Sequence, residues 1–309
     1  MSELLQELRV AASCPEGDAE AWKQFYAPKV ASVTRHRPAA AKRWSIIVVA
    51  WNSAPFVIGC LDHLIAQDGF DRDNAEIILV DNGGLDPVRN ELSERVDIEI
   101  RMTENVKLTP ARNVGVAYAS GPIINFIDDD GLVEADYAEN ALKYFEDPTV
   151  YGVRSKIIAK EHPYFTTLGY HYDRGPDPVE DALVTEGSCF LRRDLYMQVG
   201  GFGLLSGHEG MELCRRMTLA QTDGKLLYAP DVVMRHDYMD GWSKYFRKSL
   251  HYGGIGAIAS ALHPEVDRYI SDVSKRRFPK PKRTLRLRVA KQILRFGRTL
   301  LQAYSRLQH

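Results

Sequence analysis

The chain has 309 residues, of which 45% are hydrophobic and 26% are charged, and its formal net charge is −1. This composition is typical of a folded protein with one large α/β domain or two small ones, and it excludes collagen-like, repetitive and disordered chains. Its four cysteines lie far apart without a Cys-x-x-Cys pair, so we expect buried thiols in a reducing compartment.

The start of the chain, MSELLQELRV, lacks the basic region and the long apolar core of a secretory signal. The longest apolar runs are too short to cross a bilayer. We therefore expect a cytoplasmic protein. Residues 1–43 are predicted to form an N-terminal helical extension, with helical patterns over 4–12 and 19–27, and a linker, RHRPAAAKR.

A large domain is predicted over residues 44–262. Within it, apolar runs typical of strands buried on both faces alternate with segments of helical periodicity. This alternation predicts an α/β fold with right-handed crossovers and a Rossmann-like, mostly parallel sheet flanked by helices. The strands are predicted over residues 45–51, 76–80, 98–102 and 122–127, and the helices over 56–67, 88–96 and 110–119.

Polar residues follow three of the predicted strands directly, namely Asn52, Asp81 and the triplet Asp128–Asp130. In sheets of this kind, ligands bind outside the carboxyl ends of the strands. The pattern therefore gathers these residues at one edge of the sheet and predicts a ligand site there.

The acidic triplet is the sharpest feature of this edge. Its three carboxylates repel one another, and alternation along an extended chain points Asp128 and Asp130 to the same side. Both could then bind one Mg²⁺ or Mn²⁺ ion that also binds a diphosphate. The alternative is a solvated acidic turn that caps a helix beginning near Glu134.

Four segments resemble successive motifs of the family 2 glycosyltransferases: SIIVVAWNS, IILVDNGG, LTPARNVGVAYASGPIINFIDDDG and TEGSCFLRRDLYMQVGGFG. The resemblance covers about residues 44–260. It implies the GT-A fold and transfer from a nucleotide-diphosphate sugar, with a UDP-sugar expected, onto a glycan or lipid-linked acceptor with inversion of the anomeric centre. The Gln-x-x-Arg-Trp motif of the processive members is absent, so a single transfer is expected.

The resemblance also implies a set of donor-binding residues. For Asp81 the alternative is a plain β-turn, and for Arg112 it is a structural ion pair. The implied residues are Val49, Ala50, Asn52 and Asp81 at the base and ribose, Arg112 near the diphosphate or the strand that ends at Asp128, and Asp129 within the acidic triplet.

The metal site implied by the resemblance is a D-x-D pair, Asp128 and Asp130. His236 matches a histidine that follows a late strand in many members of the family and often completes this site. A neutral imidazole beside two carboxylates suits Mn²⁺ better than Mg²⁺. The alternative for His236 is a structural role.

The general base is less clear, because Glu209-Gly210 stands where the family usually has Glu-Asp, with the Asp as the base. Glu209 is the predicted replacement and Glu212 the reserve, whereas His208 is not expected to act. The alternative for Glu209 is to cap or position the helix predicted over 211–220. The missing Asp leaves open a non-catalytic nucleotide-sugar-binding protein.

The C-terminal tail, residues 263–309, is basic. Twelve Lys and Arg lie between 275 and 306, which leaves 28 basic against 41 acidic residues in the first 274. From Leu285 onward the apolar residues recur at helical spacing, which predicts a cationic amphipathic helix suited to an anionic membrane surface. Packing on the chain's own acidic domain or on a second copy in a homodimer is the alternative. No nucleic-acid-binding motif accompanies the charge, so nucleic acid is not the expected partner.

Overall fold

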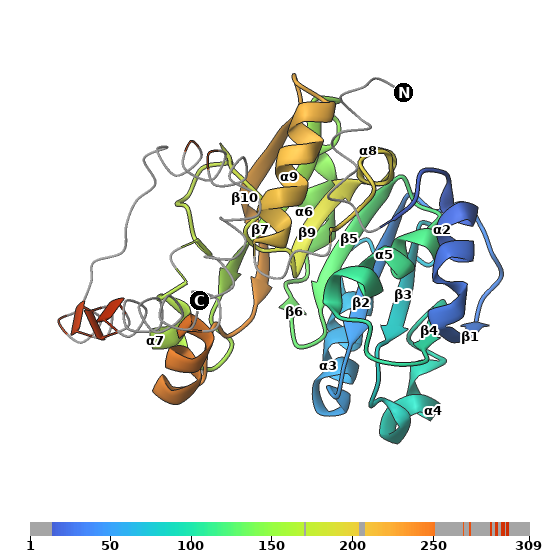
Figure 1. Ribbon diagram of the computed structural model, residues 1–309, viewed down its shortest axis with the longest axis horizontal. Coiled ribbons are helices and arrows are strands. Elements are labelled where there is room, and N and C mark those ends of the chain that lie inside the picture. The colour runs from blue at the N-terminus through green and yellow to red at the C-terminus, as the bar shows by residue number, and fades with distance from the viewer. Residues whose placement is uncertain are drawn as a thin grey trace, which may run out of the picture.

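The computed structural model describes residues 14–169, 171–203 and 208–250, together with single residues between 268 and 296. A ten-stranded mixed sheet forms its centre, with helices on both faces (Figure 1). The strands follow the order β1-β4-β3-β2-β5-β9-β7-β10-β6, with β8 paired to β10.

The bounds of the strands and helices are as follows. The strands are β1 (Val30–Arg35), β2 (Trp44–Ala50), β3 (Ala75–Asp81), β4 (Ile98–Met102), β5 (Ile123–Asp128), β6 (Leu132–Val133), β7 (Val150–Ile158), β8 (Val179–Glu180), β9 (Ser188–Arg192) and β10 (Lys225–Arg235). The helices are α2 (Ala19–Tyr26), α3 (Ala54–Ile65), α4 (Arg89–Leu92), α5 (Leu108–Tyr118), α6 (Tyr137–Tyr144), α7 (Pro163–Thr166), α8 (Arg193–Gln198) and α9 (Glu209–Ala220), with short 3-10 turns η2 (Ala27–Lys29) and η3 (Asp86–Val88).

The predicted α/β architecture is confirmed. The four strands predicted from the sequence correspond to β2, β3, β4 and β5, which pair in parallel. The helix predicted over 88–96 is shorter, because the N–H groups of Arg95 and Val96 both turn back to the carbonyl of Leu92. The second half of the sheet is mixed, since β9 runs antiparallel between β5 and β7.

Strand residues alternate between the two faces of the sheet, so each face has its own core. Ile47 and Val49 of β2 belong to the core that α2, α5, α8 and α9 cover. Ile46 and Val48 belong to the other core, which α3 and α6 cover. Because both faces are covered, β2 and β3 are buried along their whole length, as their largely apolar sequences indicate.

The segment before Trp44 packs onto this core. Trp22 of α2 is fully buried against Tyr196, with 6.2 Å between the ring centroids, and its indole N–H donates to the carbonyl of Pro15. Strand β1 then pairs antiparallel with β4. Strand β1 could not be predicted from the sequence, because five of its six residues are exposed and it lacks the apolar run of a buried strand. The domain boundary near residue 44 stays a prediction.

Helix α5 approaches the sheet closely at Gly115, where an added methyl group would lie 2.5 Å from Cγ2 of Ile47. We expect Gly115→Ala to lower the free energy of unfolding by about 1–3 kcal/mol, because extra volume in a packed core forces side chains apart. The matched control is Gly59→Ala on α3, where nothing lies within 4 Å of the new methyl group. It should raise stability by about 0.5–1 kcal/mol, as alanine favours a helix over glycine. Urea denaturation measures both, and equal effects of the two substitutions would contradict the packing described.

Among the described residues, no helix has the length and apolar character needed to span a membrane. The described tail residues from 285 to 296 are helical, which agrees with the predicted helix there. Four apolar side chains of its predicted face are exposed, namely Leu285, Val289, Ile293 and Phe296. The rest of the predicted tail lies outside the described residues.

Candidate active site

The carboxyl ends of β2, β3 and β5 meet at one edge of the sheet, as predicted. Register aligns Val49 of β2 with Asp128 of β5, and Ala50 of β2 with Asp81 of β3. The strands leave this edge through linked turns, since the N–H of Asn52 donates to the carbonyl of Gly83 at 2.8 Å. The predicted donor-binding residues of β2 and β3 and the acidic triplet therefore lie side by side.

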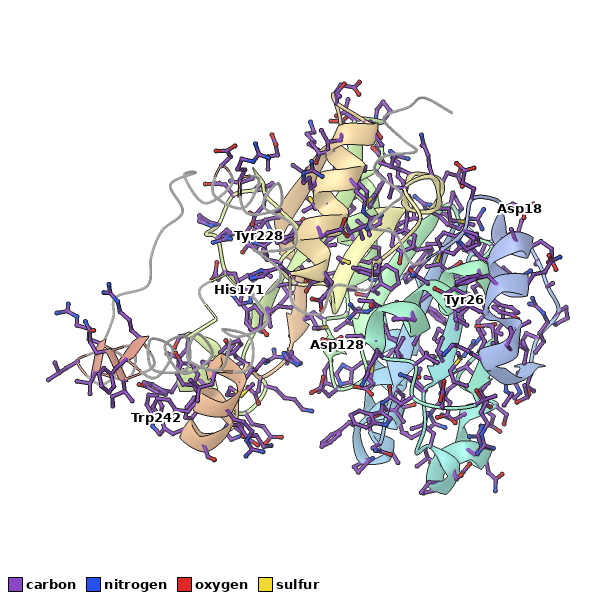
Figure 2. The ribbon with its side chains drawn as sticks, viewed as in Figure 1. Asp18, Tyr26, Asp128, His171, Tyr228 and Trp242 are labelled. Carbon is purple, nitrogen blue, oxygen red and sulfur yellow. The ribbon has the colours of Figure 1, made fainter. Side chains whose placement is uncertain are left out.

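Asp128 is the last residue of β5 and lies near the middle of the molecule, where the two halves of the sheet meet (Figure 2). Its backbone N–H donates to the carbonyl of Gly187, and a methyl group added to Gly187 would overlap the Asp128 carboxylate. The glycine thus leaves the room that this carboxylate occupies. Beyond Asp128 the chain turns, with the N–H of Gly131 donating to the Asp128 carbonyl. The prediction that Asp128 and Asp130 point to the same side assumed an extended strand through Asp130. The strand ends at Asp128, so this alternation does not apply to Asp130.

Arg112 of α5 holds the Asp128 carboxylate. Its Nη2 lies 2.9 Å from Oδ1 of Asp128, and the residue is only 3% exposed. The guanidinium also lies over the rings of Phe126 and Phe202. Its Nη1 is buried and has no hydrogen-bond partner among the described residues. Arg112 therefore presents one unused donor beside Asp128, in addition to the ion pair.

Asp130 pairs with His236, which follows β10. Oδ1 of Asp130 lies 3.4 Å from Nε2 of His236, and Nδ1 of His236 lies 3.5 Å from the hydroxyl of Tyr172. Burial opposes the charge on each group, but their mutual attraction prevails, so the pKa of Asp130 is lowered and that of His236 is raised. The negative charge of Asp128 also contributes to the raised pKa of His236. The three predicted metal ligands thus share one electrostatic environment.

Asp129 faces the turn after β2 instead. Its Oδ2 accepts a hydrogen bond from the backbone N–H of Trp51 at 3.3 Å. Burial raises the pKa of Asp129 to about 6, and the charges of Asp128 and Asp130 add to the increase. Asp129 therefore ties the acidic triplet to the β2–α3 turn, where the Trp51 side chain is 58% exposed.

Asp81 is buried and has structural partners. Its Oδ1 accepts from the N–H of Gly83 at 2.9 Å, and Oδ2 pairs with Arg89, which also pairs with Glu99. The turn geometry that the sequence analysis gave as the alternative for Asp81 is therefore present.

Two lysines bring positive charge to the acidic edge. Lys160 lowers the pKa of Asp130, and its ammonium lies over the ring of Phe56. Burial lowers the pKa of Lys248, against the charges of Asp128 and Asp130. Lys248 comes from helical residues 242–250. This helix also carries Trp242, which packs against aromatic rings of α7 and appears apart from Asp128 in Figure 2.

The predicted base, Glu209, is the first residue of α9 and is half-buried. The reserve candidate Glu212 is buried, and both of its oxygens accept from Arg216 at 2.5 and 2.6 Å. Arg216 in turn donates to the carbonyls of Val199 and Gly201. Glu212 is therefore held in a structural ion pair. His208 is exposed, with a left-handed backbone (φ 64°).

A second carboxylate that the sequence analysis did not single out lies beside Glu209. Oε1 of Glu186 accepts from the N–H of Gly210 at 3.0 Å. Burial raises the pKa of Glu186 to about 7, and the negative charge of Glu209 adds to this increase. Glu186 lies within a motif quoted for the resemblance, but a single glutamate before a strand gives no sign of burial or of a neighbour 24 residues away.

The donor types at this edge, two carboxylates and an imidazole, are those of a Mn²⁺ or Mg²⁺ site. Within the described parts of the chain, however, no three His, Cys, Asp or Glu side chains converge into a preformed metal cluster. Arg112 holds Asp128, and His236 holds Asp130. The residue types therefore fit a divalent cation, while Asp128 and Asp130 form ion pairs with Arg112 and His236 in this structure.

Comparison with known proteins gives one family. The family model described as Glycosyl transferase family 2 matches residues 45–206. A pre-mycofactocin glycosyltransferase of Mycobacterium tuberculosis is 28% identical over 204 residues, which cover 61% of this chain and 43% of that protein. Glycosyltransferase GlyA of Streptococcus pneumoniae is 31% identical over 136 residues, which cover 41% of this chain and 19% of that protein. The chain thus spans less than half the length of these relatives.

Two solved structures share the fold. The mannosyltransferase PcManGT from Pyrobaculum calidifontis, in complex with GDP-Man and Mn²⁺, has a TM-score of 0.57 at 21% identity and covers 96% of this chain and 92% of its own. TarS 1-349 of S. aureus, in complex with UDP-GlcNAc, has a TM-score of 0.51 at 15% identity and covers 69% of this chain and 66% of its own. These similarities confirm the expected GT-A fold.

Proposed function

The chain belongs to glycosyl transferase family 2, and from this premise we propose that it transfers a single sugar from a nucleotide-diphosphate sugar to an acceptor hydroxyl, with inversion at the anomeric carbon. The observation that carries this proposal is the meeting of the acidic triplet, Arg112 and His236 with the ends of β2 and β3. The acceptor is proposed to be a glycan or a lipid-linked precursor.

The donor nucleotide is proposed to lie across the ends of β2 and β3. Val49, Ala50 and Asn52 would line the base and ribose, together with Asp81. The PcManGT and TarS complexes hold GDP-Man and UDP-GlcNAc respectively, which supports a nucleotide-sugar donor for this chain. A UDP-sugar stays the expected donor.

The diphosphate is proposed to lie against the acidic triplet. Asp128, Asp130 and His236 would hold a divalent cation there, Mn²⁺ or Mg²⁺, and Mn²⁺ in the PcManGT complex supports this choice. Neutralisation of the charge that develops on the leaving diphosphate is the chemistry that a bound cation supplies. Arg112 would donate to the diphosphate through Nη1, which lacks a partner among the described residues. Asp129 would keep the β2–α3 turn in place beside the donor.

The acceptor hydroxyl needs a general base as its oxygen attacks the anomeric carbon. A carboxylate at or beside the start of α9 is proposed to take this role, and the sequence predicts Glu209, the first residue of this helix. The N–H of Gly210 in α9 donates to Glu186, and the next residue, Gly187, lies against the Asp128 carboxylate, which supports a base in this region.

A screen by thermal unfolding tests this function. UDP, GDP, UDP-GlcNAc and GDP-mannose are each added with Mn²⁺, with Mg²⁺ or with EDTA. A ligand at about 100 times its dissociation constant stabilises by about 2.7 kcal/mol, which raises the melting temperature by several degrees. We expect such a rise for one nucleotide family and only with a divalent cation.

Release of nucleoside diphosphate from the ligand found in this screen separates the two candidate functions. A transferase releases it slowly to water and faster with an acceptor, whereas a non-catalytic binding protein gives the thermal shift and no release. Absence of any shift with every nucleotide would reject both.

The tail over residues 275–306 is proposed to bind an anionic membrane surface, which would place the enzyme at the inner face of the membrane. The exposed side chains of Leu285, Val289, Ile293 and Phe296 support this proposal. Co-sedimentation with phosphatidylglycerol vesicles should exceed that with phosphatidylcholine vesicles. Equal sedimentation with both, or a stable dimer that needs the tail, would count against it.

A further inference from the structure

Glu186 lies against the first turn of α9, which begins with Glu209. We infer that Glu186, and not Glu209, takes the proton of the acceptor hydroxyl. This inference rests on the proposed function and names the base within it.

The first observation is the space that the Glu186 side chain occupies. A methyl group added to Gly210 would overlap the carboxyl group of Glu186. The glutamate from the turn before β9 therefore fills the volume into which any side chain at position 210 would project. Gly210 is buried, and it leaves this room because it has no side chain.

The second observation is orientation. Oε1 of Glu186 accepts from the N–H of Gly210 at 3.0 Å, in the first turn of α9. Together with a hydrogen bond from the backbone N–H of Glu186 itself, this contact fixes the orientation of the carboxylate. A base held in one orientation by a backbone donor is the arrangement that general-base catalysis needs.

The third observation is position. The residue after Glu186 is Gly187, which backs directly onto the Asp128 carboxylate. Arg112 acts electrostatically on Glu186 and pairs with Asp128, so one guanidinium lies near both carboxylates. Glu186 therefore belongs to the same edge as the proposed diphosphate site.

The charged and titratable groups that act on Glu186 come from several elements. Burial raises the pKa of Glu186 to about 7, the negative charge of Glu209 from α9 raises it further, and Arg112 from α5 opposes the increase. The charge of Glu186 also contributes to the raised pKa of Tyr172 and of Cys189, for both of which burial is the largest cause. A carboxyl group with a pKa close to the operating pH suits a general base.

The step balances as a single displacement. The acceptor oxygen forms its bond to the anomeric carbon while the bond from that carbon to the phosphate oxygen breaks. The nucleoside diphosphate leaves with the electron pair of the broken bond. The proton of the acceptor hydroxyl moves to the carboxylate of Glu186, which becomes a neutral carboxylic acid.

The test compares Glu186→Gln with Glu209→Gln in the full chain, with UDP-GlcNAc or GDP-mannose as the donor, Mn²⁺ present and water as the acceptor. We expect Glu186→Gln to lower nucleoside diphosphate release about a hundredfold or more. Donor affinity should stay within about threefold of wild type, because the glutamine fills the same space and its carbonyl can accept from Gly210. Glu146→Gln, at an exposed glutamate beyond α6, is the control that should change nothing.

Glu209→Gln should behave differently. It is expected to keep at least about a tenth of the wild-type rate at high pH, since Glu186 remains. Removal of the neighbouring negative charge stabilises ionised Glu186, so the acid limb of the pH–rate profile should move to lower pH. Loss of activity in Glu209→Gln with retention in Glu186→Gln would overturn the inference and leave the proposed function standing. A wild-type protein that neither binds nor turns over these donors would overturn the proposed function, and the inference with it.

A second pair of variants guards against misfolding of Glu186→Gln. Gly210→Ala should displace the Glu186 carboxyl group and lower release similarly, with donor affinity retained. The combined E186A and G210D variant returns a carboxylate to the same space from α9. It should release nucleoside diphosphate at least about tenfold faster than E186A alone, by the usual contribution of a positioned base. A purely structural role for Glu186 predicts no such recovery, and its absence would overturn the inference.

Discussion

Replacing Asp130 by alanine is expected to lower turnover of the nucleotide-sugar donor about a thousandfold. Removal of one preorganised group that stabilises transition-state charge typically costs a factor of about 10²–10³. Asp130 also holds His236, with 3.4 Å between Oδ1 and Nε2, so the substitution disturbs two of the three proposed cation ligands. The rate of nucleoside diphosphate release at saturating Mn²⁺ measures the effect.

The control for this substitution is Asp194→Ala. The Asp194 side chain is almost fully exposed and pairs only loosely with Arg193, at 3.8 Å. Its replacement should leave turnover and folding unchanged, since exposed ion pairs contribute little. A rate for Asp130→Ala close to that of this control would remove Asp130 from the catalytic machinery.

Asp181→Asn is expected to lower the free energy of unfolding by about 3–5 kcal/mol, because it leaves buried cations without their counter-charge. Asp181 and Arg154 are fully buried, and Nε of Arg154 lies 2.9 Å from Oδ2 of Asp181. Nε of Arg174 lies 3.0 Å from the same oxygen. The ring of Tyr228 covers the Arg154 guanidinium at 4.7 Å, which leaves water little access to the pair. Urea denaturation at neutral pH measures the loss.

The matched control is Glu139→Gln, which breaks an ion pair with Lys143 in which both side chains are 58% exposed. It should cost less than about 0.5 kcal/mol.

The effect of Asp181 also depends on pH. Burial opposes ionisation of Asp181, but Arg154 and Arg174 lower its pKa in the folded protein. The contribution of Asp181 to the free energy of unfolding is therefore fully present above its unfolded-state pKa and is lost as the pH falls through its folded-state pKa. A constant difference between wild type and Asp181→Asn down to strong acid would contradict this ion pairing.

The edge of the sheet could be predicted from the sequence because it depends on local patterns. Each parallel strand appears as an apolar run, and the residue that ends the run has a known place at the carboxyl edge. Asp81 and Asp128 were placed in this way, and the register confirms their position beside Ala50 and Val49. Each strand is apolar where it is buried, so the end of the apolar run in the sequence marks the end of the strand.

Features that depend on distant partners could not be predicted. Strand β1 is exposed along most of its length and exists because β4 offers it a backbone edge. The half-buried carboxyl group of Glu186 gains its hydrogen bond from Gly210, 24 residues away, and Asp181 gains its charge partner Arg154 from 27 residues away. A glutamate or an aspartate in the sequence has the same appearance in a loop on the surface as in a buried pair, so only the fold distinguishes them.

The two halves of the site thus differ in origin. The proposed donor half lies at the ends of β2, β3 and β5, and each of these ends is located by the apolar run that precedes it in the sequence. The proposed acceptor half lies at the turn before β9 and at the start of α9, where Glu186 and Gly210, 24 residues apart, are joined by a hydrogen bond. Substitutions in the donor half are expected to change cation-dependent nucleotide binding, whereas those at Glu186 are expected to change the rate with little change in affinity.

Calorimetric titration of the wild-type chain with UDP and with GDP, in Mn²⁺ and in EDTA, tests the acidic edge as a cation-assisted nucleotide site most directly. We expect one of the two nucleotides to bind at least about tenfold more tightly in Mn²⁺, which is about 1.4 kcal/mol, and we expect Asp130→Ala to abolish this difference. Equal affinity in Mn²⁺ and EDTA, or an undiminished Mn²⁺ effect in Asp130→Ala, would show that Asp128, Asp130 and His236 do not hold a cation for the donor.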